Sequence, residues 1–304
     1  MKRQLTIVFF LMVAGLMANA QKEYRIAKAN GNLRLNINGA TIEGYDGKEI
    51  IFSIQNEVDQ KLDDRAKGLV ALSPSGLTDN TGMGFSILSN GLDINVDNVL
   101  KNSYDILKIM VPKGIKIFVN NNSNQFYEDF IIRNMAGEIE LSTSYNKIRL
   151  ENNSGPMNIS SINGAIEATF DRDIKGPISI VSIYDYVDIT LPATTKANIE
   201  MVTFYGKLYA AKEFSIEPDL AEAAKTSQVQ SKGSKEVVNT AGKNIGGTQI
   251  NKNRQNSPSS LAIGGSVGFG QQYVRAEKIK GKLNGGGLDL IIRSNNQNIY
   301  LRNK

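Results

Sequence analysis

The sequence contains no cysteine, no histidine and no tryptophan among its 304 residues. Without cysteine there is no disulfide, no thiolate metal site, no cysteine nucleophile and no lipidated cysteine of the bacterial lipoprotein type. Without histidine, the commonest general base near neutral pH and the commonest metal ligand are both missing. These absences exclude Ser-His-Asp, Cys-His and histidine–zinc mechanisms.

Neither positive nor negative charge is concentrated in one part of the sequence. The 35 Lys and Arg residues nearly balance the 30 Asp and Glu residues, which leaves a formal net charge of +5. The basic residues are scattered along the chain instead of forming a cluster, whereas a nucleic-acid site needs a basic patch or stripe. We therefore expect no nucleic-acid partner.

Only the N-terminus carries a long hydrophobic run. Lys2 and Arg3 precede the apolar residues 5–17, and Ala18-Asn19-Ala20 has the small residues of a cleavage site. A membrane anchor is the alternative, but this run is shorter than the roughly 20 residues of a spanning helix. The sequence predicts export by a signal peptide to the periplasm, the outer-membrane surface or the extracellular space, with no transmembrane segment after cleavage.

An internal repeat is the strongest positive signal in the chain. Two-residue units recur at intervals of 18, 21 and 21 residues, and each is followed by an aliphatic residue: Tyr145-Asn146, Asn163-Gly164, Tyr184-Asp185 and Tyr205-Gly206. A fixed period near 20 residues is typical of stacked architectures, in which no single repeat buries its apolar face alone. The sequence therefore predicts an all-β fold, a single-chain parallel β-solenoid with rungs of about 18–21 residues.

Aliphatic residues in this region come in pairs that alternate with polar residues, the pattern of a strand with one buried face. The pairs are Ile139 and Leu141, Ile148 and Leu150, Met157 and Ile159, Ile166 and Ala168, Ile178 and Ile180, Val187 and Ile189, Ile199 and Met201, and Leu208 and Ala210. Antiparallel hairpins would alternate in the same way, but the regular offset favours a coil that stacks like on like. At the turns, Asn146, Gly164, Asp185 and Gly206 indicate a positive φ.

Four regions are expected along the chain. Residues 1–20 form the signal peptide, and residues 21–216 form the β-solenoid with an N-terminal cap region, in which residues 31–54 are its N-terminal end. The period disappears in residues 217–272, whose composition is too polar to offset the entropy of ordering, so we expect a mobile polar insertion. The pattern resumes in residues 273–304, which are expected to complete the C-terminal end of the coil as a last rung.

Three stretches of sequence resemble a known bacterial family. Val111-Pro112-Lys113-Gly114 precedes the first clear repeat, Gly137–Ala210 carries a serial G-x-I-x-L texture, and Gly281–Lys304 contains a GGG run and an IYLR ending. These stretches are similar to the family named "bacterial putative adhesin", an exported domain of unknown function for which a parallel β-solenoid is predicted. The resemblance covers most of the mature chain except the insertion. It implies an envelope or surface location and a binding or structural role, and it supplies no catalytic residue.

Aromatic residues recur near one turn of the repeats, at Tyr145, Tyr184, Phe204 and Tyr205. If they are exposed, they form a candidate ligand platform, because aromatic faces stack on sugar rings and on other flat apolar ligands. The alternative is an aromatic ladder that only stabilises the coil through contacts between neighbouring strands.

Carboxylates are the remaining acid–base groups. Asp171 and Asp173 flank Arg172, and Asp185 and Asp188 lie around a turn. Paired carboxylates serve glycoside hydrolysis or calcium binding in other proteins, but no calcium-loop motif and no phosphate loop is present here. The sequence therefore predicts no catalytic residue, no cofactor and no metal site.

Together these features predict an exported, non-enzymatic protein, adhesin-like or envelope-associated, that presents a repetitive surface to a glycan or an envelope protein. One alternative is a carbohydrate-active β-helix enzyme, a polysaccharide lyase or hydrolase, because parallel β-helices host such sites on one outward face. The other is a structural periplasmic scaffold with no external ligand. The lack of histidine, tryptophan and an acidic cluster argues against the enzyme.

Overall fold

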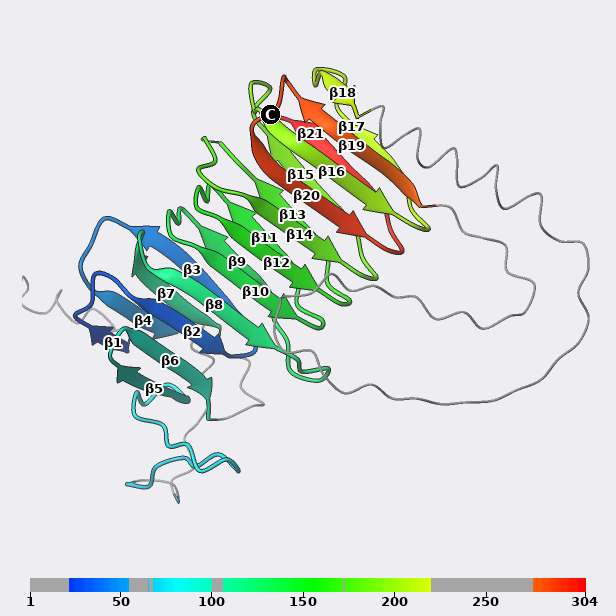
Figure 1. The fold of residues 1–304 in the computed structure, drawn as a ribbon. Helices are drawn as coiled ribbons and strands as arrows, with labels where there is room; N and C mark the ends of the chain where they lie inside the picture. The colour runs from blue at the N-terminus through cyan, green and yellow to red at the C-terminus, as the bar shows by residue number, and fades with distance from the viewer. Residues whose placement is uncertain (1–21, 55–64, 66–67, 100–105, 172, 220–275) are drawn as a thin grey trace, which may run out of the picture. The chain divides into compact units, whose positions relative to one another are not determined.

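The computed structural model describes residues 22–54, 65, 68–99, 106–171, 173–219 and 276–304. The predicted signal peptide and residues 220–272 of the predicted polar insertion lie outside this part of the chain. Its strands, β1 to β21, form two sheets within one compact unit (Figure 1). None of the described residues forms a helix long and apolar enough to cross a membrane.

The two sheets are called sheet A and sheet B, and their strands are given in spatial order. Sheet A contains β1 (Glu23–Ile26), β4 (Ile50–Ile54), β7 (Leu107–Pro112), β3 (Ala40–Tyr45), β9 (Phe130–Arg133), β11 (Ile148–Glu151), β13 (Ile166–Thr169), β15 (Val187–Leu191), β21 (Ile299–Asn303) and β17 (Leu208–Ala210). Sheet B contains β18 (Ile216–Pro218), β19 (Glu277–Leu283), β16 (Ala197–Thr203), β20 (Leu288–Ser294), β14 (Ile178–Ser182), β12 (Met157–Ser161), β10 (Ile139–Thr143), β8 (Lys116–Asn121), β2 (Asn32–Asn36), β6 (Asp93–Asn98) and β5 (Phe85–Asn90).

From β8 to β17 the chain alternates between the sheets, so one strand of sheet B and the next strand of sheet A form one rung. Neighbouring strands in the middle of both sheets pair in parallel, and the antiparallel pairs of β1, β4, β5, β18 and β19 lie at the two ends. The fold is thus all-β with two largely parallel sheets, an arrangement consistent with a β-solenoid.

The predicted register is confirmed in the central repeats. Ile139 lies opposite Met157, and Met157 lies opposite Ile178, so partners are offset by one period of the sequence. Ile148, Ile166 and Val187 are aligned in the same way in sheet A. Because these pairs are parallel, the hairpin alternative is wrong for this region.

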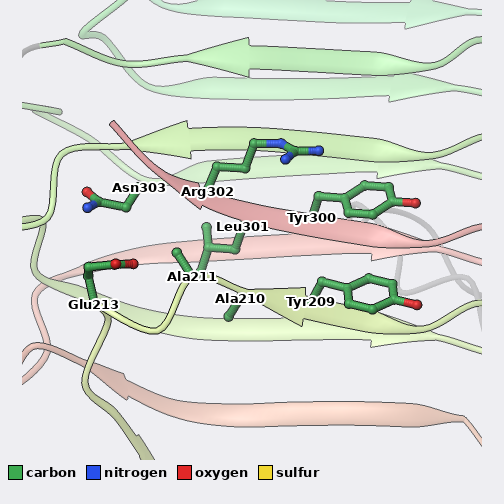
Figure 2. Close-up of a pocket in the computed structure, with 8 residues that line it drawn as sticks. All are labelled: Tyr209, Ala210, Ala211, Glu213, Tyr300, Leu301, Arg302 and Asn303. Carbon is green, nitrogen blue, oxygen red and sulfur yellow. The ribbon is translucent and has the colours of Figure 1, made fainter.

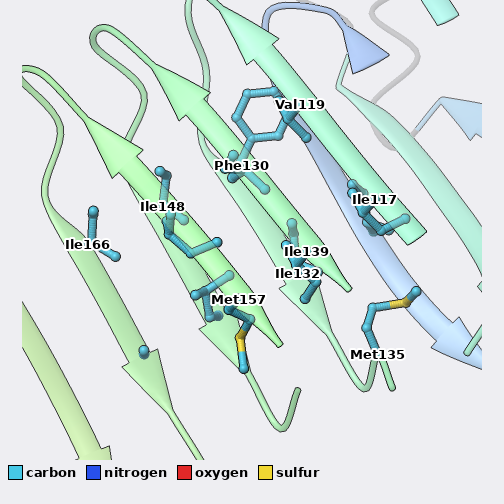
Figure 3. Close-up of a cluster of buried hydrophobic side chains, with 14 of the residues drawn as sticks. Ile117, Val119, Phe130, Ile132, Met135, Ile139, Ile148, Met157 and Ile166 are labelled. Carbon is cyan, nitrogen blue, oxygen red and sulfur yellow. The ribbon is translucent and has the colours of Figure 1, made fainter. Parts of the chain in front are cut away.

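The aliphatic residue pairs form the core between the sheets, as Figure 3 shows for residues that include Ile139, Ile148 and Ile166. These three side chains are fully buried. Burial of each such side chain contributes about 1.5–3 kcal/mol to the stability of the fold. Leu208 is only half-buried and Ala210 is exposed, because β17 is an edge strand of sheet A.

The sequence order predicted that residues 273–304 complete the C-terminal end of the coil as its last rung. The structure places β20 and β21 elsewhere. β20 pairs with β14 on one side and β16 on the other, and β21 lies between β15 and β17. β20 and β21 therefore fill a place inside the stack, whereas β19 lies near the end of sheet B, between β18 and β16.

The prediction that residues 31–54 form the N-terminal end of the stack holds only for β4. β2 lies between β6 and β8, and β3 lies between β7 and β9, so the rung that these two strands form is internal. β1 and β4 lie at the end of sheet A, and β5 and β6 lie at the end of sheet B.

The predicted positive φ at the turns is also wrong. Among the described residues, the non-glycine residues with positive φ are Asn134, Asn152 and Asn284, which lie at other turns. Gly164 is required for a different reason: a Cβ there would collide with the backbone oxygen of Asn146 in the neighbouring rung. The turns of adjacent rungs approach too closely for a side chain at this position.

Candidate functional site

The turns that follow β10, β12, β14, β20 and β16 line up along one edge of the two sheets (Figure 1). Backbone hydrogen bonds continue from turn to turn: Ile162 N donates to Thr143 O over 3.0 Å, Tyr184 N to Ile162 O over 2.8 Å, and Asn296 N to Ile183 O over 3.1 Å. Equivalent residues of successive turns are therefore held at about the strand spacing of 4.8 Å.

Buried hydroxyl groups of Ser161, Ser182, Ser294 and Thr203 hold four of these five turns in place. The last residue of each preceding strand is a serine or threonine: Thr143, Ser161, Ser182, Ser294 and Thr203. Ser182 Oγ donates to Gly164 O of the previous turn over 3.0 Å and accepts from Asp185 N of its own turn over 3.2 Å. Ser294 and Thr203 repeat both contacts in the next two turns. This hydroxyl ladder was not recognised in the sequence, although its residues recur with the period of the repeat.

The hydroxyl ladder leads to a stability prediction. Ser182→Ala should lower the free energy of unfolding by about 1–3 kcal/mol, because Gly164 O and Asp185 N then lose a partner in a buried place. Thr143→Val is the matched control: the buried Thr143 Oγ1 makes no hydrogen bond, so its removal should be neutral or stabilising. Urea unfolding of both variants measures the difference, and equal losses would contradict the assigned role of the ladder.

In each turn, the residue two positions after this serine or threonine belongs to a row that we call the turn strip. In spatial order it consists of Tyr145, Asn163, Tyr184, Asn296 and Tyr205. Its tyrosines are 39%, 55% and 68% exposed, in the order of the chain. Three of the four aromatic residues singled out in the sequence belong to this strip, and Phe204, 45% exposed, lies beside Tyr205.

The tyrosines of the turn strip alternate with asparagines. Asn163 separates Tyr145 from Tyr184, and the inserted β20–β21 turn places Asn296 between Tyr184 and Tyr205. The tyrosines therefore lie on every second turn, about 10 Å apart. No ring pair joins them to one another among the described residues, so they do not themselves form a stacking ladder.

The five residues of the turn strip and the residues directly before them carry no charge: Ser144 and Tyr145, Ile162 and Asn163, Ile183 and Tyr184, Asn295 and Asn296, and Phe204 and Tyr205. Asp185, which follows Tyr184, is partly exposed and adds one negative charge beside the strip. Lys147 and Lys207 follow closer to sheet A, and Lys147 pairs with Glu167 across 2.7 Å. The strip thus offers aromatic faces and amide groups between charged borders.

Tyr127 extends the aromatic surface at one end. Its ring stacks on that of Tyr145, with centroids 5.3 Å apart and an angle of 26° between the planes. Tyr127 lies in the long turn between β8 and β9 and is itself exposed. Sequence reasoning missed this residue because that turn does not follow the repeat.

Next to the strip, on the outer face of sheet A, Glu167 lies at the centre of a polar network. It accepts a hydrogen bond of 2.6 Å from the Tyr186 hydroxyl and pairs with Lys147 and Arg149. Partial burial opposes ionisation of Glu167, but the hydrogen bonds from Lys147 and Tyr186 outweigh it and lower the pKa of the carboxyl. The same hydrogen bond to Glu167, together with burial, raises the pKa of Tyr186 to about 12.

This network predicts a pH dependence of stability. The raised pKa of Tyr186 contributes stability that is present below its ordinary value of 10.0 and is lost as pH rises towards about 12. The lowered pKa of Glu167 contributes stability that is present above its ordinary value of 4.5 and is lost as pH falls below it. Tyr186→Phe should remove the first contribution, weaken the second, and cost about 1–2 kcal/mol at pH 7.

Unfolding of Tyr186→Phe and of the unaltered protein, measured from pH 4 to pH 12, provides the test. Tyr209→Phe is the matched control, because the hydroxyl of this exposed residue takes no part in the Glu167 network. Parallel stability curves for Tyr186→Phe and the unaltered protein above pH 10 would rule out the proposed hydrogen bond.

A true aromatic ladder exists, but in residues that the sequence did not single out. The rings of Tyr209 and Tyr300 are stacked at 5.3 Å and 8°, and Tyr186 meets Tyr300 edge-on at 6.5 Å. Figure 2 shows Tyr209, Tyr300 and Arg302 on one face of sheet A. These residues help to line an open hollow of about 420 Å³. Arg302 Nε donates to both oxygens of Asp188, at 2.8 and 2.9 Å. Neighbouring strands bring these residues together, so this ladder is part of the sheet.

Two of the four carboxylates considered as acid–base groups lie in surface ion pairs. Asp188 of β15 pairs with Arg302 of the neighbouring strand β21, and Asp171 pairs with Lys304. Within the described ranges, no group of three His, Cys, Asp or Glu residues is arranged to hold a metal ion.

Comparisons with known proteins give little further information. No protein-family model matches the sequence, and no curated protein matches it. The resemblance to the adhesin family therefore remains a resemblance. Among solved structures, the chain is similar to a crystal structure described as a "putative cell adhesion protein" from Clostridium sporogenes, with a TM-score of 0.40 and 12% sequence identity over 93% of this chain and 100% of that chain. At these values the function of this chain has to be argued from its own residues.

Proposed function

We propose that this chain is an exported, non-enzymatic β-solenoid protein that binds a partner on a cell or envelope surface through the turn strip. In this role it is an adhesin-like or envelope-associated interaction protein. The observation that carries the proposal is the row of three exposed tyrosines, Tyr145, Tyr184 and Tyr205, held at regular spacing along one edge.

Two physical arguments support a binding role for this edge. Large exposed aromatic side chains are costly to leave in water when they are gathered in one place, and such patches mark interaction sites. The hydroxyl ladder also fixes the turns before any partner arrives, so binding would not have to order a loop. A regular, pre-formed edge is therefore suited to a repetitive partner.

The proposal excludes catalysis because the chain has no histidine or cysteine to act as base or nucleophile. Of the carboxylates, Asp188 and Asp171 are engaged with Arg302 and Lys304, and Glu138 pairs with Lys116 across 2.9 Å.

Adhesion of protein-coated beads to bacterial cells and to isolated envelopes tests the proposal. The variant replaces Tyr145, Tyr184 and Tyr205 with asparagine, the residue that equivalent turns carry at Asn163 and Asn296. Adhesion should fall at least about tenfold, since each lost aromatic contact is worth about 0.5–1.5 kcal/mol. Tyr209→Asn, on the face of sheet A, is the matched control and should adhere normally. Unchanged adhesion of the strip variant would refute the proposed role.

A further inference from the structure

The alternation of the turn strip has a period of two rungs. Tyrosine occupies the first, third and fifth places, and the amides of Asn163 and Asn296 occupy the second and fourth. Adjacent places lie about 4.8 Å apart, and equivalent tyrosines lie about 10 Å apart. A polymeric partner that matches this edge should present the same face at every second monomer.

Linear β-1,4-linked polysaccharides have this property. Each sugar is turned over relative to the previous one, so the same ring face recurs at every second sugar, and one sugar advances by nearly the spacing of adjacent strands. The C–H face of a pyranose ring packs on an aromatic ring, whereas its hydroxyls need hydrogen-bond donors and acceptors such as an amide. Tyrosine and asparagine in alternation provide both in the required order.

The charge distribution indicates which polysaccharides fit. The residues of the turn strip carry no positive charge that could pair with a carboxylate or sulfate of an acidic chain, and Asp185, partly exposed directly after Tyr184, is itself negative. An anionic polymer laid over Tyr184 would lose hydration without gaining a counter-charge there. A neutral chain has no such cost.

We propose that the turn strip binds a neutral, linear β-1,4-linked polysaccharide that lies along the stack, across five turns. Alternate sugars pack on Tyr145, Tyr184 and Tyr205, and the sugars between them hydrogen-bond with Asn163 and Asn296. This inference rests on the proposed function, because it names the partner class of the same strip.

Titration calorimetry with cello- and chito-oligosaccharides of two to six sugars tests the match in length. A trisaccharide spans two tyrosines and a pentasaccharide spans three, so affinity should rise about tenfold from three sugars to five. A sixth sugar should add little. A smooth rise through all lengths, or no dependence on length, would overturn the proposed register.

Single substitutions test the positions. Tyr184→Asn removes the middle contact and should weaken binding of both the trisaccharide and the pentasaccharide. Tyr205→Asn should weaken the pentasaccharide about tenfold and leave the trisaccharide nearly unchanged, since Tyr145 and Tyr184 still hold it. Thermal melts check that both variants fold, and asparagine already occurs at equivalent turns. Equal effects of the two substitutions on both ligands would contradict the arrangement.

Further outcomes separate this inference from the proposed function. If no neutral oligosaccharide binds while bead adhesion still depends on the three tyrosines, the polysaccharide proposal fails and the adhesive role of the strip stands. Tighter binding of alginate or hyaluronan than of the neutral chains would overturn the charge argument. Release of shortened sugars during the titration would contradict a purely binding role, and the alternative of a carbohydrate-active enzyme would replace it.

Discussion

Removal of residues 276–304 is expected to unfold β16 and β17 together with the strands removed, and to expose the edges of β14 and β15. β16 pairs with β19 and β20, and β17 pairs with β21, so neither retains a neighbouring strand. The deletion also removes five buried aliphatic side chains worth about 7–15 kcal/mol together, which is comparable to the whole stability of about 5–15 kcal/mol of a typical domain. These side chains are Leu283, Leu290, Ile292, Ile299 and Leu301.

Circular dichroism melts and hydrogen exchange of the shortened chain provide the measurement. A peptide of residues 276–304 added to the shortened chain should restore protection of β16, since the place between β14 and β16 is then filled again. The same peptide with Ile292→Asp is the matched control and should not restore it. A shortened chain that melts at the unaltered temperature, with β16 still protected, would disprove the observed strand order.

The second large effect is expected in the middle of the stack. Ile180→Asp should cost more than about 4 kcal/mol and prevent cooperative folding, because it places a carboxylate between the buried aliphatic residues Ile159 and Ile292. Ser179→Asp introduces the same group one residue earlier, on the outward face. Its cost should stay within about 1 kcal/mol.

Chemical unfolding of the two variants measures both effects. The comparison is sharp because the introduced side chain and the strand are the same, and only the face of β14 differs. Similar losses in the two proteins would mean that β14 does not alternate between core and surface as described.

The parallel register could be predicted from the sequence because the two-residue alternation within each strand and the repeat of about 20 residues indicate the same pairing of strands. Alternation of aliphatic and polar residues fixed which side chains of the strands face the core, and the offset of about 20 residues matched Ile139 with Met157. The order of the first and last rungs could not be predicted in this way. Ile292 of β20 fits beside Ile180 as well as Ile199 would, so the pattern alone does not say which strand is the neighbour.

The candidate site could also be predicted only in part from the sequence. The repeat singled out Tyr145, Tyr184 and Tyr205 as neighbours along one row of turns, but only the structure shows that they are exposed. Their alternation with amides depends on Asn296, which comes about 90 residues after Tyr205 in the chain and reaches the strip only through the inserted rung. The hydroxyl ladder, in contrast, was visible in principle, because Ser161 and Ser182 are separated by one period.

The internal position of the β2–β3 and β20–β21 rungs has a consequence for how this architecture can lengthen during evolution. A unit duplicated from either of these rungs would meet an occupied place, because β2 and β3 and also β20 and β21 already have neighbours on both sides. From β8 to β15, in contrast, the order of the rungs follows the order of the chain. A duplicated unit there would add one rung and leave both ends as they are. Longer proteins built on this plan should therefore carry their extra repeats in the middle of the sequence, and each added rung would lengthen the turn strip by one place.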